Sequence, residues 1–513
     1  MRPKGPRQIA GALCFVRFFP FSLIKMCRCL ANFGRTWYNC CNINYFEEWR
    51  TVRFINPAKV CKGMEMGDIP PSREILKTTL AVAWPSVLES FFVNLAGMVD
   101  TIMVGTMGSY AIAAVGLTIQ PKMLGLALFL SLNVAVSAIV ARRKGAGDRE
   151  SANRVVRMCL LITLGMTALT SAVFVAFAGP IVRLVGSQPD THEYAVEYLQ
   201  IIMGGQVFNT VSLVLNAAQR GAGNTRIAMV TNLISNVVNV IFNYLLIGGN
   251  LGFPELGVRG AAIATVLGTV CACALSIASV LRKDSFINLR SVKGWLPERQ
   301  SRSSIGNVWS SSLVEQVCLR IGFLLFSMTV ARLGTTELAA HQIGSNMMSM
   351  SFSFGDGLSV AAITLIGQSL GRQRPDMAKI YGSVCQRLGL CCACVMGFIY
   401  FFFGKEIFLL YSNDPVILDY GAMIMRILSV VLFMQIEQVV QFGCLRGAGD
   451  TKFTALVSFI SVTFIRPGAS WLLCYPIGLG LMGAWLGTAL DQLVRFLLTF
   501  FRFRKGNWTK LKL

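Results

Sequence analysis

Long apolar stretches separated by short polar connectors run from residue 70 to residue 505. Each stretch is roughly 20–30 residues long, enough for an α-helix to cross a hydrocarbon core of about 30 Å. Strands of a membrane barrel would be shorter, and lipid offers no water to the edges of an open sheet. The pattern predicts twelve spanning helices, at residues 72–107, 109–140, 150–178, 191–219, 224–248, 257–282, 304–333, 335–370, 375–404, 414–445, 450–473 and 481–505.

The second half of this pattern repeats the first. Arg-Gly-Ala-Gly-Asn-Thr at residues 220–225 returns as Arg-Gly-Ala-Gly-Asp-Thr at 446–451, which is 226 positions later. The same offset relates Glu89 to Glu315. A duplicated apolar unit is typical of membrane transporters built from two related bundles. Because each unit holds six helices, both insert in the same orientation, and the pseudo-twofold axis should lie along the membrane normal.

Five segments follow from the duplication. We expect an all-α membrane protein with an N-lobe bundle at residues 70–282 and a C-lobe bundle at 304–505. A cytoplasmic linker at 283–303 should join them, and a basic cytoplasmic tail should follow at 506–513. No apolar run in residues 1–65 is long enough to span, and we predict a basic, disordered extension that packs little against the bundles. The alternative is an anchor at the membrane surface that is attracted to anionic lipid.

The composition excludes an ordinary soluble protein. Hydrophobic residues make up 54% of the chain and charged residues only 14%, with a mean hydropathy of +0.59. Soluble domains carry about 25% charged residues, which cover their surface. The bilayer is therefore the expected environment.

A net charge of +22 would suit a nucleic-acid-binding protein, but the positions of the basic residues argue against that function. Lys and Arg gather in alternate connectors, at 142–144, 220–226 and 282–302, whereas the connectors at 105–109 and 246–257 hold none. This alternation predicts a multi-pass protein of the cell (inner) membrane with both termini in the cytoplasm. We expect no nucleic-acid partner.

Several other chemistries lack the residues they need. The chain has two histidines, His192 and His341, too few for a histidine-rich metal site. No Walker sequence is present to hold ATP phosphates, and the cysteines lack a second metal-binding pair at suitable spacing. We therefore expect a transporter rather than an enzyme, without a cofactor, and with no metal beyond a possible Na⁺.

Carboxylates inside the predicted spans are the strongest candidates for function, because each costs about 2.5–3.5 kcal/mol or more in lipid. They are Glu89, Asp100, Glu315, Asp356, Glu437 and Asp491. Arg495 follows Asp491 by one helical turn, which predicts a local ion pair.

Asp100 has natural partners in the fifth span. Four asparagines, Asn232, Asn236, Asn239 and Asn243, fall at spacings of four, three and four, which places them along one helix face. Amide, carboxylate and hydroxyl oxygens are hard ligands that suit Na⁺ or a hydrated proton. The alternative is that the amides only join helices by hydrogen bonds in lipid.

Residues 70–505 resemble the multidrug and toxic compound extrusion (MATE) family of cation-coupled antiporters. The resemblance rests on Val-Asp-Thr-Ile-Met-Val-Gly at 99–105, Asn-x-x-x-Asn-Tyr at 239–244, Gly-x-Pro-Glu-Leu-Gly at 252–257 and Ala-Ala-His-Gln at 339–342, together with the paired Arg-Gly-Ala-Gly turns. It implies two six-helix bundles around a central cavity that opens alternately to each side of the membrane.

The resemblance also implies roles for single residues. Asp100 matches the aspartate that binds the coupling cation, with Asn239, Asn243 and Thr265 beside it. Asn at 243 is similar to the NorM-like bacterial branch. The acidic positions of that branch would fall near Leu319 and Gln435, so the chain departs from its C-lobe pattern.

Further candidates concern the substrate and the motion. We expect Glu315, Asp356, Glu437 and Gln435 to face the substrate cavity and to favour cations. Pro85 removes a hydrogen bond within the first span, which permits a hinge there. Its repeat counterpart is Ser311, so only the N-lobe should bend.

The expected function is secondary efflux of organic, cationic and amphipathic drugs in exchange for H⁺ or Na⁺, with the bilayer and the drugs as partners and without ATP. The alternative is a flippase for lipid-linked oligosaccharides with a related architecture. A flippase would need a cationic groove for pyrophosphate, whereas the spans of this chain are mostly acidic.

Overall fold

The computed structural model describes residues 57–61, 64–282, 285–290 and 299–511. The chain divides into two units, residues 1–56 and 57–513, and all described residues belong to the second. All regular secondary structure in the described residues is helical. The prediction of a disordered extension therefore lies outside the described residues as far as position 56.

The N-lobe contains the helices of the first repeat. They are α4 (Ser72–Gly105), α5 (Ser109–Gly145), α6 (Arg149–Ala176), α7 (Ala178–Val185), α8 (Pro189–Gly204), α9 (Gln206–Gly221), α10 (Thr225–Ile247), the 3₁₀ turn η4 (Asn250–Gly252) and α11 (Gly257–Leu281). A short helix, α3 (Pro57–Val60), precedes them.

The C-lobe contains the helices of the second repeat. They are α12 (Arg299–Ala331), α13 (Thr335–Gly371), α14 (Pro375–Leu409), α15 (Pro415–Ala448), α16 (Thr451–Ser458), the π-helix η5 (Phe459–Ile465), α17 (Arg466–Cys474), α18 (Gly480–Lys505) and the 3₁₀ turn η6 (Asn507–Lys510).

Each of the twelve predicted spans falls on a helix, or on helices that continue one another. Ten spans in the described residues are long and apolar enough to cross a membrane, or eleven if the bent pair α8–α9 is one span. α18 covers the twelfth predicted span but is more charged, since it carries Asp491, Arg495 and a basic last turn. The all-α membrane fold is therefore confirmed.

Two spans are broken where local chemistry interrupts the helix. α8 and α9 meet at an angle of 46° beside Gly205, where a Cβ would lie 2.6 Å from the Val266 side chain. α16 and α17 are joined by the π-helix, which ends just before Pro467. Proline has no N–H to donate to the preceding turn, and such defects widen or bend helices.

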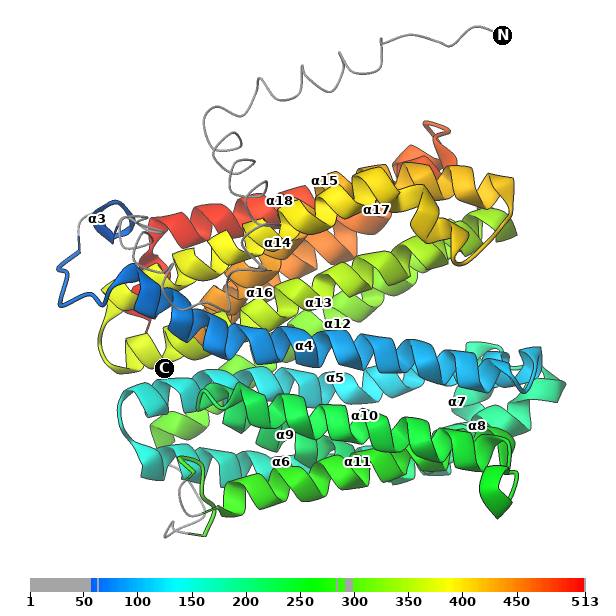
Figure 1. The fold of residues 1–513 in the computed structure, drawn as a ribbon, viewed down its shortest axis with the longest axis horizontal. Helices are drawn as coiled ribbons and strands as arrows, with labels where there is room; N and C mark the ends of the chain where they lie inside the picture. Colours follow the sequence, from blue (N-terminus) through cyan, green and yellow to red (C-terminus); the bar gives the residue numbers. More distant parts are fainter. Residues whose placement is uncertain (1–56, 62–63, 283–284, 291–298, 512–513) are drawn as a thin grey trace, which may run out of the picture. The chain divides into compact units, whose positions relative to one another are not determined.

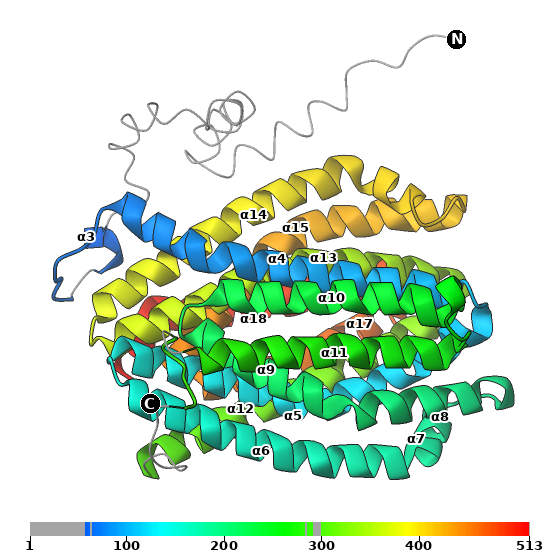
Figure 2. The same ribbon diagram turned by 60° about the horizontal axis from the view of Figure 1, so that its bottom comes forward.

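The two lobes meet along α4, α5, α12 and α13, as Figures 1 and 2 show. α4 packs on α10 of its own lobe and on α13 of the other lobe, while α5 packs on α9 and also on α12 and α13. The first two helices of each repeat therefore build the boundary between the lobes.

Glycines bring the lobes into backbone contact at the end of the bundle that carries Arg142, which we call the arginine-rich end. A Cβ on Gly145 of α5 would lie 2.0 Å from the Gln368 carbonyl oxygen of α13. A Cβ on Gly371, its repeat counterpart, would lie 2.0 Å from the Arg142 carbonyl oxygen. Only glycine allows this approach, and it occurs once from each side.

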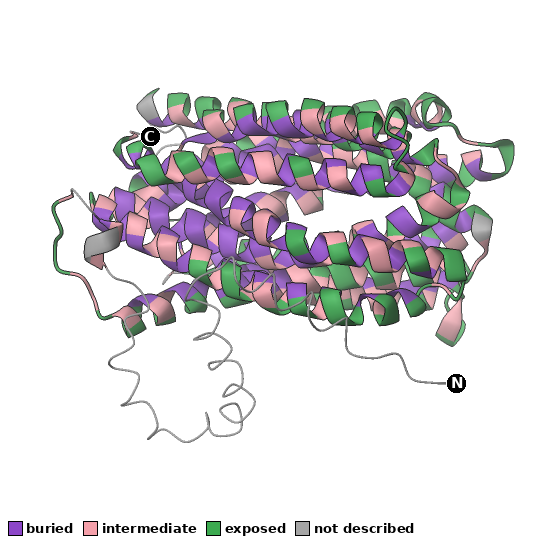
Figure 3. Ribbon diagram, turned by 90° about the horizontal axis from the view of Figure 1, so that it is seen from above, coloured by how far each residue is buried: buried purple, intermediate pink, exposed green. Residues whose placement is uncertain are grey.

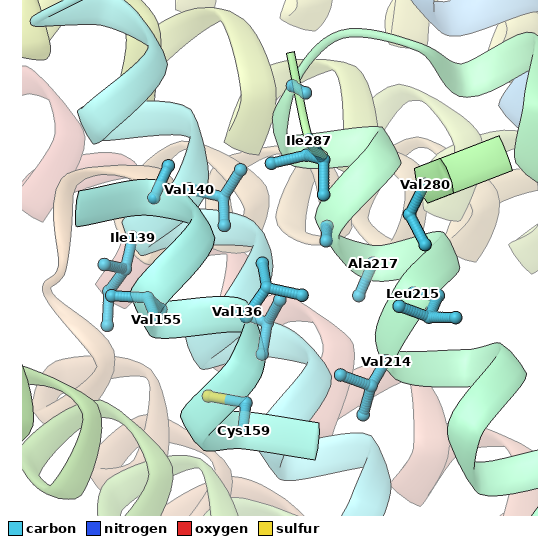
Figure 4. Close-up of a cluster of buried hydrophobic side chains, with 14 of the residues drawn as sticks. Val136, Ile139, Val140, Val155, Cys159, Val214, Leu215, Ala217, Val280 and Ile287 are labelled. Atoms are coloured by element: carbon cyan, nitrogen blue, oxygen red, sulfur yellow. The ribbon is translucent and has the colours of Figure 1, made fainter. Parts of the chain in front are cut away.

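Most of the core of each lobe consists of buried apolar residues. Figure 3 colours the buried positions along the ribbon. In the N-lobe, Val136 and Val140 of α5 pack against Cys159 of α6 and Val214 of α9 (Figure 4). Ile287, which lies in the predicted linker, is fully buried in the same cluster. The described part of the linker, residues 285–290, therefore belongs to the N-lobe core.

The first and last described residues both pack against the helical bundles. The Cys61 thiol donates to the Asp376 carbonyl 3.5 Å away, and the Arg374 guanidinium donates to the Asp68 carbonyl at 2.8 Å. In the predicted tail, Trp508 is fully buried and stacks on Phe503. Residues 57–61 and 507–511 therefore pack against the bundles. For residues 57–61 this differs from the expectation of an extension that packs little against them.

Candidate functional site

The predicted partners of Asp100 surround it in the N-lobe. Asp100 is half-buried on α4, and the Asn243 amide of α10 donates to its Oδ1 over 2.7 Å. Asn243 is 1% exposed and Asn239 is 7% exposed, so both amides lie in the interior of the lobe. The spacing of the two asparagines puts them on one face of α10, and α10 packs along α4.

Asn239 also directs its side-chain amide nitrogen at the Asp100 carboxylate. In the amide orientation that satisfies both ends, its nitrogen donates to Asp100 Oδ1 at 2.6 Å. Its oxygen then accepts from the Thr265 N–H and hydroxyl, both at 3.2 Å. Thr265 of α11 therefore orients the amide and does not contact the carboxylate.

This arrangement presents donors to the carboxylate. Two N–H groups stabilise ionised Asp100, whereas a metal ion would need the amide oxygens turned toward it. Asn243 Oδ1 is buried without a partner in the described residues, so one amide oxygen is available to a further ligand. The geometry suits a carboxylate that exchanges a proton better than a closed metal cage.

Two neighbours of Asp100 were missed in the sequence. Lys122 of α5 is half-buried and interacts electrostatically with Asp100, and Tyr198 of α8 is 6% exposed beside Asp100 and Thr265. A lysine in the middle of an apolar span is itself a signal of function. The spans are thus less uniformly acidic than the sequence suggested.

The other half of the asparagine stripe serves a different group. Asn232 donates to Glu89 Oε1 over 2.6 Å, and Asn236 donates to the Phe92 carbonyl over 3.5 Å. Glu89 also forms an ion pair with Arg220 at 2.8 Å. The stripe therefore supports two carboxylates of α4, at different depths.

Glu315 repeats the arrangement of Glu89 in the C-lobe. It is 1% exposed, forms an ion pair with Arg446, and accepts from the Thr454 hydroxyl at 3.0 Å. Both Arg-Gly-Ala-Gly turns thus place their arginine on the glutamate of the first helix of the repeat. The structure places Glu315 in this pair within the C-lobe and not free in a cavity.

The remaining substrate candidates are dispersed. Asp356 of α13 accepts from Ser90 of α4 at 3.3 Å, which places it on the boundary between the lobes. Glu437 of α15 lies against Gly389 of α14, and forms no hydrogen bond or ion pair within the described ranges. Gln435 is buried, and neither of its amide atoms has a partner in the described part of the chain. These residues do not form one site with Glu315.

The ion pair expected between Asp491 and Arg495 is present at 2.7 Å, and a second arginine completes it. Arg466 of α17 contacts Asp491 at 2.6 Å, and its guanidinium lies 4.7 Å from the centre of the Phe323 ring. The three charged side chains are at most 7% exposed. Arg466 could not be predicted as a partner of Asp491, because it lies 25 residues earlier and on a different helix.

Pro85, the predicted hinge, is buried in α4. The helix continues through it from Ser72 to Gly105, and its counterpart Ser311 instead hydrogen-bonds Thr451 across 2.7 Å. A bend at Pro85 remains a prediction.

Comparisons with known proteins agree with this architecture. The MatE family profile matches residues 85–245 and 312–472, one match in each lobe. A relative from Thermotoga maritima, named as a probable multidrug resistance protein NorM, is 29% identical over 444 residues, which are 85% of this chain and 94% of that protein. The multidrug resistance protein MdtK of Yersinia enterocolitica is 28% identical and covers 83% of this chain and 95% of its own length.

A solved structure shows the same fold. It is described as the outward-facing conformation of a multidrug resistance MATE family transporter, and it matches with a TM-score of 0.80 at 21% identity. The match covers 85% of this chain and 97% of that one.

Proposed function

We propose that this chain, which belongs to the MatE family of membrane transport proteins, exports amphipathic organic cations from the cell in exchange for a cation that binds at Asp100. The observation that carries the proposal is the half-buried carboxylate of Asp100 with the amides of Asn239 and Asn243 directed at it. In the described spans, no other carboxylate has two side-chain amides directed at it.

The coupling ion that fits this geometry best is the proton. The two amides offer N–H groups, which stabilise the ionised state, while the apolar surroundings disfavour a buried charge. A carboxylate held between these effects can release and regain a proton when its access to the two sides of the membrane changes. Na⁺ remains the second candidate, through the unpartnered oxygen of Asn243.

Coupling requires that drug and cation oppose each other. Binding of the cation neutralises Asp100, and we propose that α4 then bends near Pro85 and narrows the N-lobe side of the cavity. Drug and cation must each weaken the binding of the other by the same factor. Contacts between the lobes at the arginine-rich end support a state that is open at the opposite end, which the positive-inside rule places outside the cell.

The test is ethidium efflux from vesicles that contain the purified protein, under an imposed H⁺ or Na⁺ gradient. We expect a proton gradient to drive efflux, and Asp100→Asn to abolish it without loss of ethidium binding. Asp419→Asn, at an exposed carboxylate of α15, is the matched control and should keep the wild-type rate. Efflux by Asp100→Asn at the wild-type rate would show that the coupling site lies elsewhere.

A further inference from the structure

Two buried arginines share one carboxylate in the interior of the C-lobe. Arg466 and Arg495 both bind Asp491, and all three side chains are buried. Within the described residues, no second carboxylate forms an ion pair with either arginine. The charged groups that interact with Arg466 are Asp491 and Arg495. The cluster therefore carries one positive charge that the described chain does not compensate.

Such a charge is costly in the interior of a membrane protein. An ion removed from water loses several kcal/mol of solvation unless an opposite charge replaces the water. The rings of Phe323 and Phe326, centred 4.7 Å and 5.8 Å from the Arg466 guanidinium, reduce this cost through their negative faces. An aromatic ring has no net charge, however, so the cluster still lacks a counter-ion.

Buried polar atoms without a partner gather in the same lobe. Four glutamines and two serines, each at most 2% exposed, contribute to this group, and one of the two arginines does so as well. In the described part of the chain, the atoms without a hydrogen bond include Arg495 Nε, both amide atoms of Gln435, Gln438 Oε1, Gln441 Nε2, Gln492 Oε1, Asp491 Oδ1 and the hydroxyls of Ser458 and Ser461. Native interiors leave few such atoms unpaired, so their concentration here indicates a ligand.

The glutamines of α15 lie level with the charged residues of α18. The Thr499 hydroxyl of α18 donates to Gln441 Oε1 of α15 at 2.5 Å, which aligns the two helices. Both helices run toward the arginine-rich end. One turn back along each of them stand Arg495 and Gln438, which therefore share a level in the bundle.

The π-helix η5 faces the same level. It packs on α18, and Arg466, the residue directly after it, binds Asp491. Ser461 of η5 precedes Arg466 by five residues on an element that runs opposite to α18, which returns it to the level of Arg495. π-helices are rare and occur mostly at functional sites. The widened helix therefore adjoins the uncompensated charge.

The N-lobe shows that the scaffold does not require these charges. With the three-residue deletion in the second repeat, Asp491 corresponds to Gly268 and Arg495 to Ala272. A Cβ on Gly268 would lie 2.8 Å from the Ser235 carbonyl oxygen, so α10 and α11 pack closely where the C-lobe has its cluster. The cluster is thus a feature of the C-lobe alone, and its purpose is to be sought in what it binds.

We propose that the C-lobe encloses a chloride ion beside Arg495, between α15, α18 and η5. Chloride is small and singly negative, and it neutralises the extra guanidinium. Serine hydroxyls and glutamine amides can turn their donors toward it by side-chain rotation, without a change in the backbone. Because the charged groups are buried, the ion is enclosed as the lobe folds and stays with the chain. This site is separate from Asp100 and does not depend on the proposed efflux function.

The test measures chloride carried by the purified full chain. The protein is desalted into sodium gluconate buffer and then denatured, and the chloride released is determined by ion chromatography against the same buffer without protein. We expect about one chloride ion per chain, since one charge of the cluster is uncompensated. Arg495→Gln should release none, because Arg466 and Asp491 then balance each other.

Two further variants separate a specific site from general attraction of anions. Arg495→Lys keeps the charge and should retain the ion. Arg426→Gln removes an exposed arginine of α15 and should release as much chloride as the wild type.

Thermal unfolding at constant ionic strength provides a second reading. An ion that binds the folded chain raises its melting temperature as the concentration of that ion increases. We expect this rise when chloride replaces gluconate for the wild type, Arg495→Lys and Arg426→Gln, and no rise for Arg495→Gln.

Two outcomes would overturn the proposal. A wild-type protein that releases no chloride has a cluster hydrated by water only. Equal release by the wild type and Arg495→Gln shows an adventitious ion only. If Arg495→Gln does not fold, loss of chloride from Arg495→Lys together with its retention by Arg426→Gln also contradicts a site that depends on charge. Efflux is measured separately, so its failure leaves this result untouched.

Discussion

The two lobes share a backbone plan but treat positive charge in opposite ways. Asp100 of the N-lobe corresponds to Phe326 of the C-lobe, and Asn243 corresponds to Ala469. Where the N-lobe has a carboxylate and amides, the C-lobe has an aromatic ring and a methyl group. The Arg466 guanidinium lies 5.8 Å from the centre of the Phe326 ring.

In the C-lobe, the positive charge beside the carboxylate comes from buried arginine side chains of the protein. Arg466 and Arg495 both bind Asp491, and none of the three is accessible enough to exchange with solvent ions. In the N-lobe, Asp100 forms no ion pair with an arginine of the described residues; its nearest protein cation is Lys122, which interacts with it electrostatically. The two repeats share one scaffold, and a few side chains give the C-lobe a buried charge cluster and the N-lobe a carboxylate for which we propose ion exchange.

What the lobes retained in common lies at the arginine-rich end. The pairs Glu89–Arg220 and Glu315–Arg446 occupy equivalent positions, as do Gly145 and Gly371. These features hold the first helix of each repeat to the turn after its fourth span and bring the lobes into contact. The lobes therefore share the ion pairs and glycine contacts of the arginine-rich end, and they differ in the charged side chains deeper in the bundle.

The largest expected effect comes from breaking the internal charge cluster of the C-lobe. Asp491→Asn leaves Arg466 and Arg495 buried without a counter-charge, and should destabilise the protein by about 3–5 kcal/mol. Asp100→Asn removes the corresponding kind of group from the N-lobe and should leave the melting temperature unchanged. Thermal unfolding followed by size-exclusion chromatography compares the two. Equal melting temperatures for both variants would contradict the structural role of the cluster.

A second pair of variants tests the shared ion pairs. Glu315→Gln and Glu89→Gln should each cost about 3 kcal/mol, because each leaves a largely buried arginine unpaired. Affinity for ethidium should stay at the wild-type value in both, since neither glutamate is free to bind a drug. Binding titrations and thermal unfolding provide the two readings. A loss of drug affinity in Glu315→Gln alone would restore that residue to the substrate site.

The two equivalent threonines give a smaller contrast. Thr265→Val removes the hydroxyl that orients Asn239, and should slow proton-driven efflux by about fivefold, the value of one neutral hydrogen bond. Thr488→Val removes a hydroxyl that donates only to the Ala484 carbonyl one turn back, and should leave efflux within about twofold. The rates are compared in vesicles under the same gradient. Equal slowing by both would mean that the C-lobe also takes part in coupling.

The smallest effect concerns the motion. Pro85→Ala restores a hydrogen bond within α4 and should lower the turnover rate by about two- to threefold at unchanged drug affinity, if the missing bond eases bending. Ser311→Ala, at the equivalent place in α12, should change turnover less. Single-turnover efflux with dye already bound measures both. An unchanged rate in Pro85→Ala would remove the hinge from the mechanism.

The sequence anticipated the N-lobe site because its information is local. The positions of Asn239 and Asn243 one turn apart fix them on one face of α10, and the apolar stretches fix the length of each helix. It failed for Arg466 and for Lys122, since nothing in the spacing of residues along the chain tells which helix stands opposite. For the same reason the prediction that Glu315 faces the substrate cavity was made without knowledge of its partner; in the structure Glu315 forms an ion pair with Arg446.

The sequence by itself determined where the helical spans lie, their duplication and the carboxylate with its two amides, because helix length and helical face depend on neighbours along the chain. Only the tertiary structure decided which charges meet. Asp491 forms an ion pair with Arg466, and Glu89 forms one with Arg220. Arg320 forms no ion pair within the described residues. Contact between helices depends on the relative depth, rotation and separation of whole elements, and these are set by packing over the entire bundle and not by any single segment.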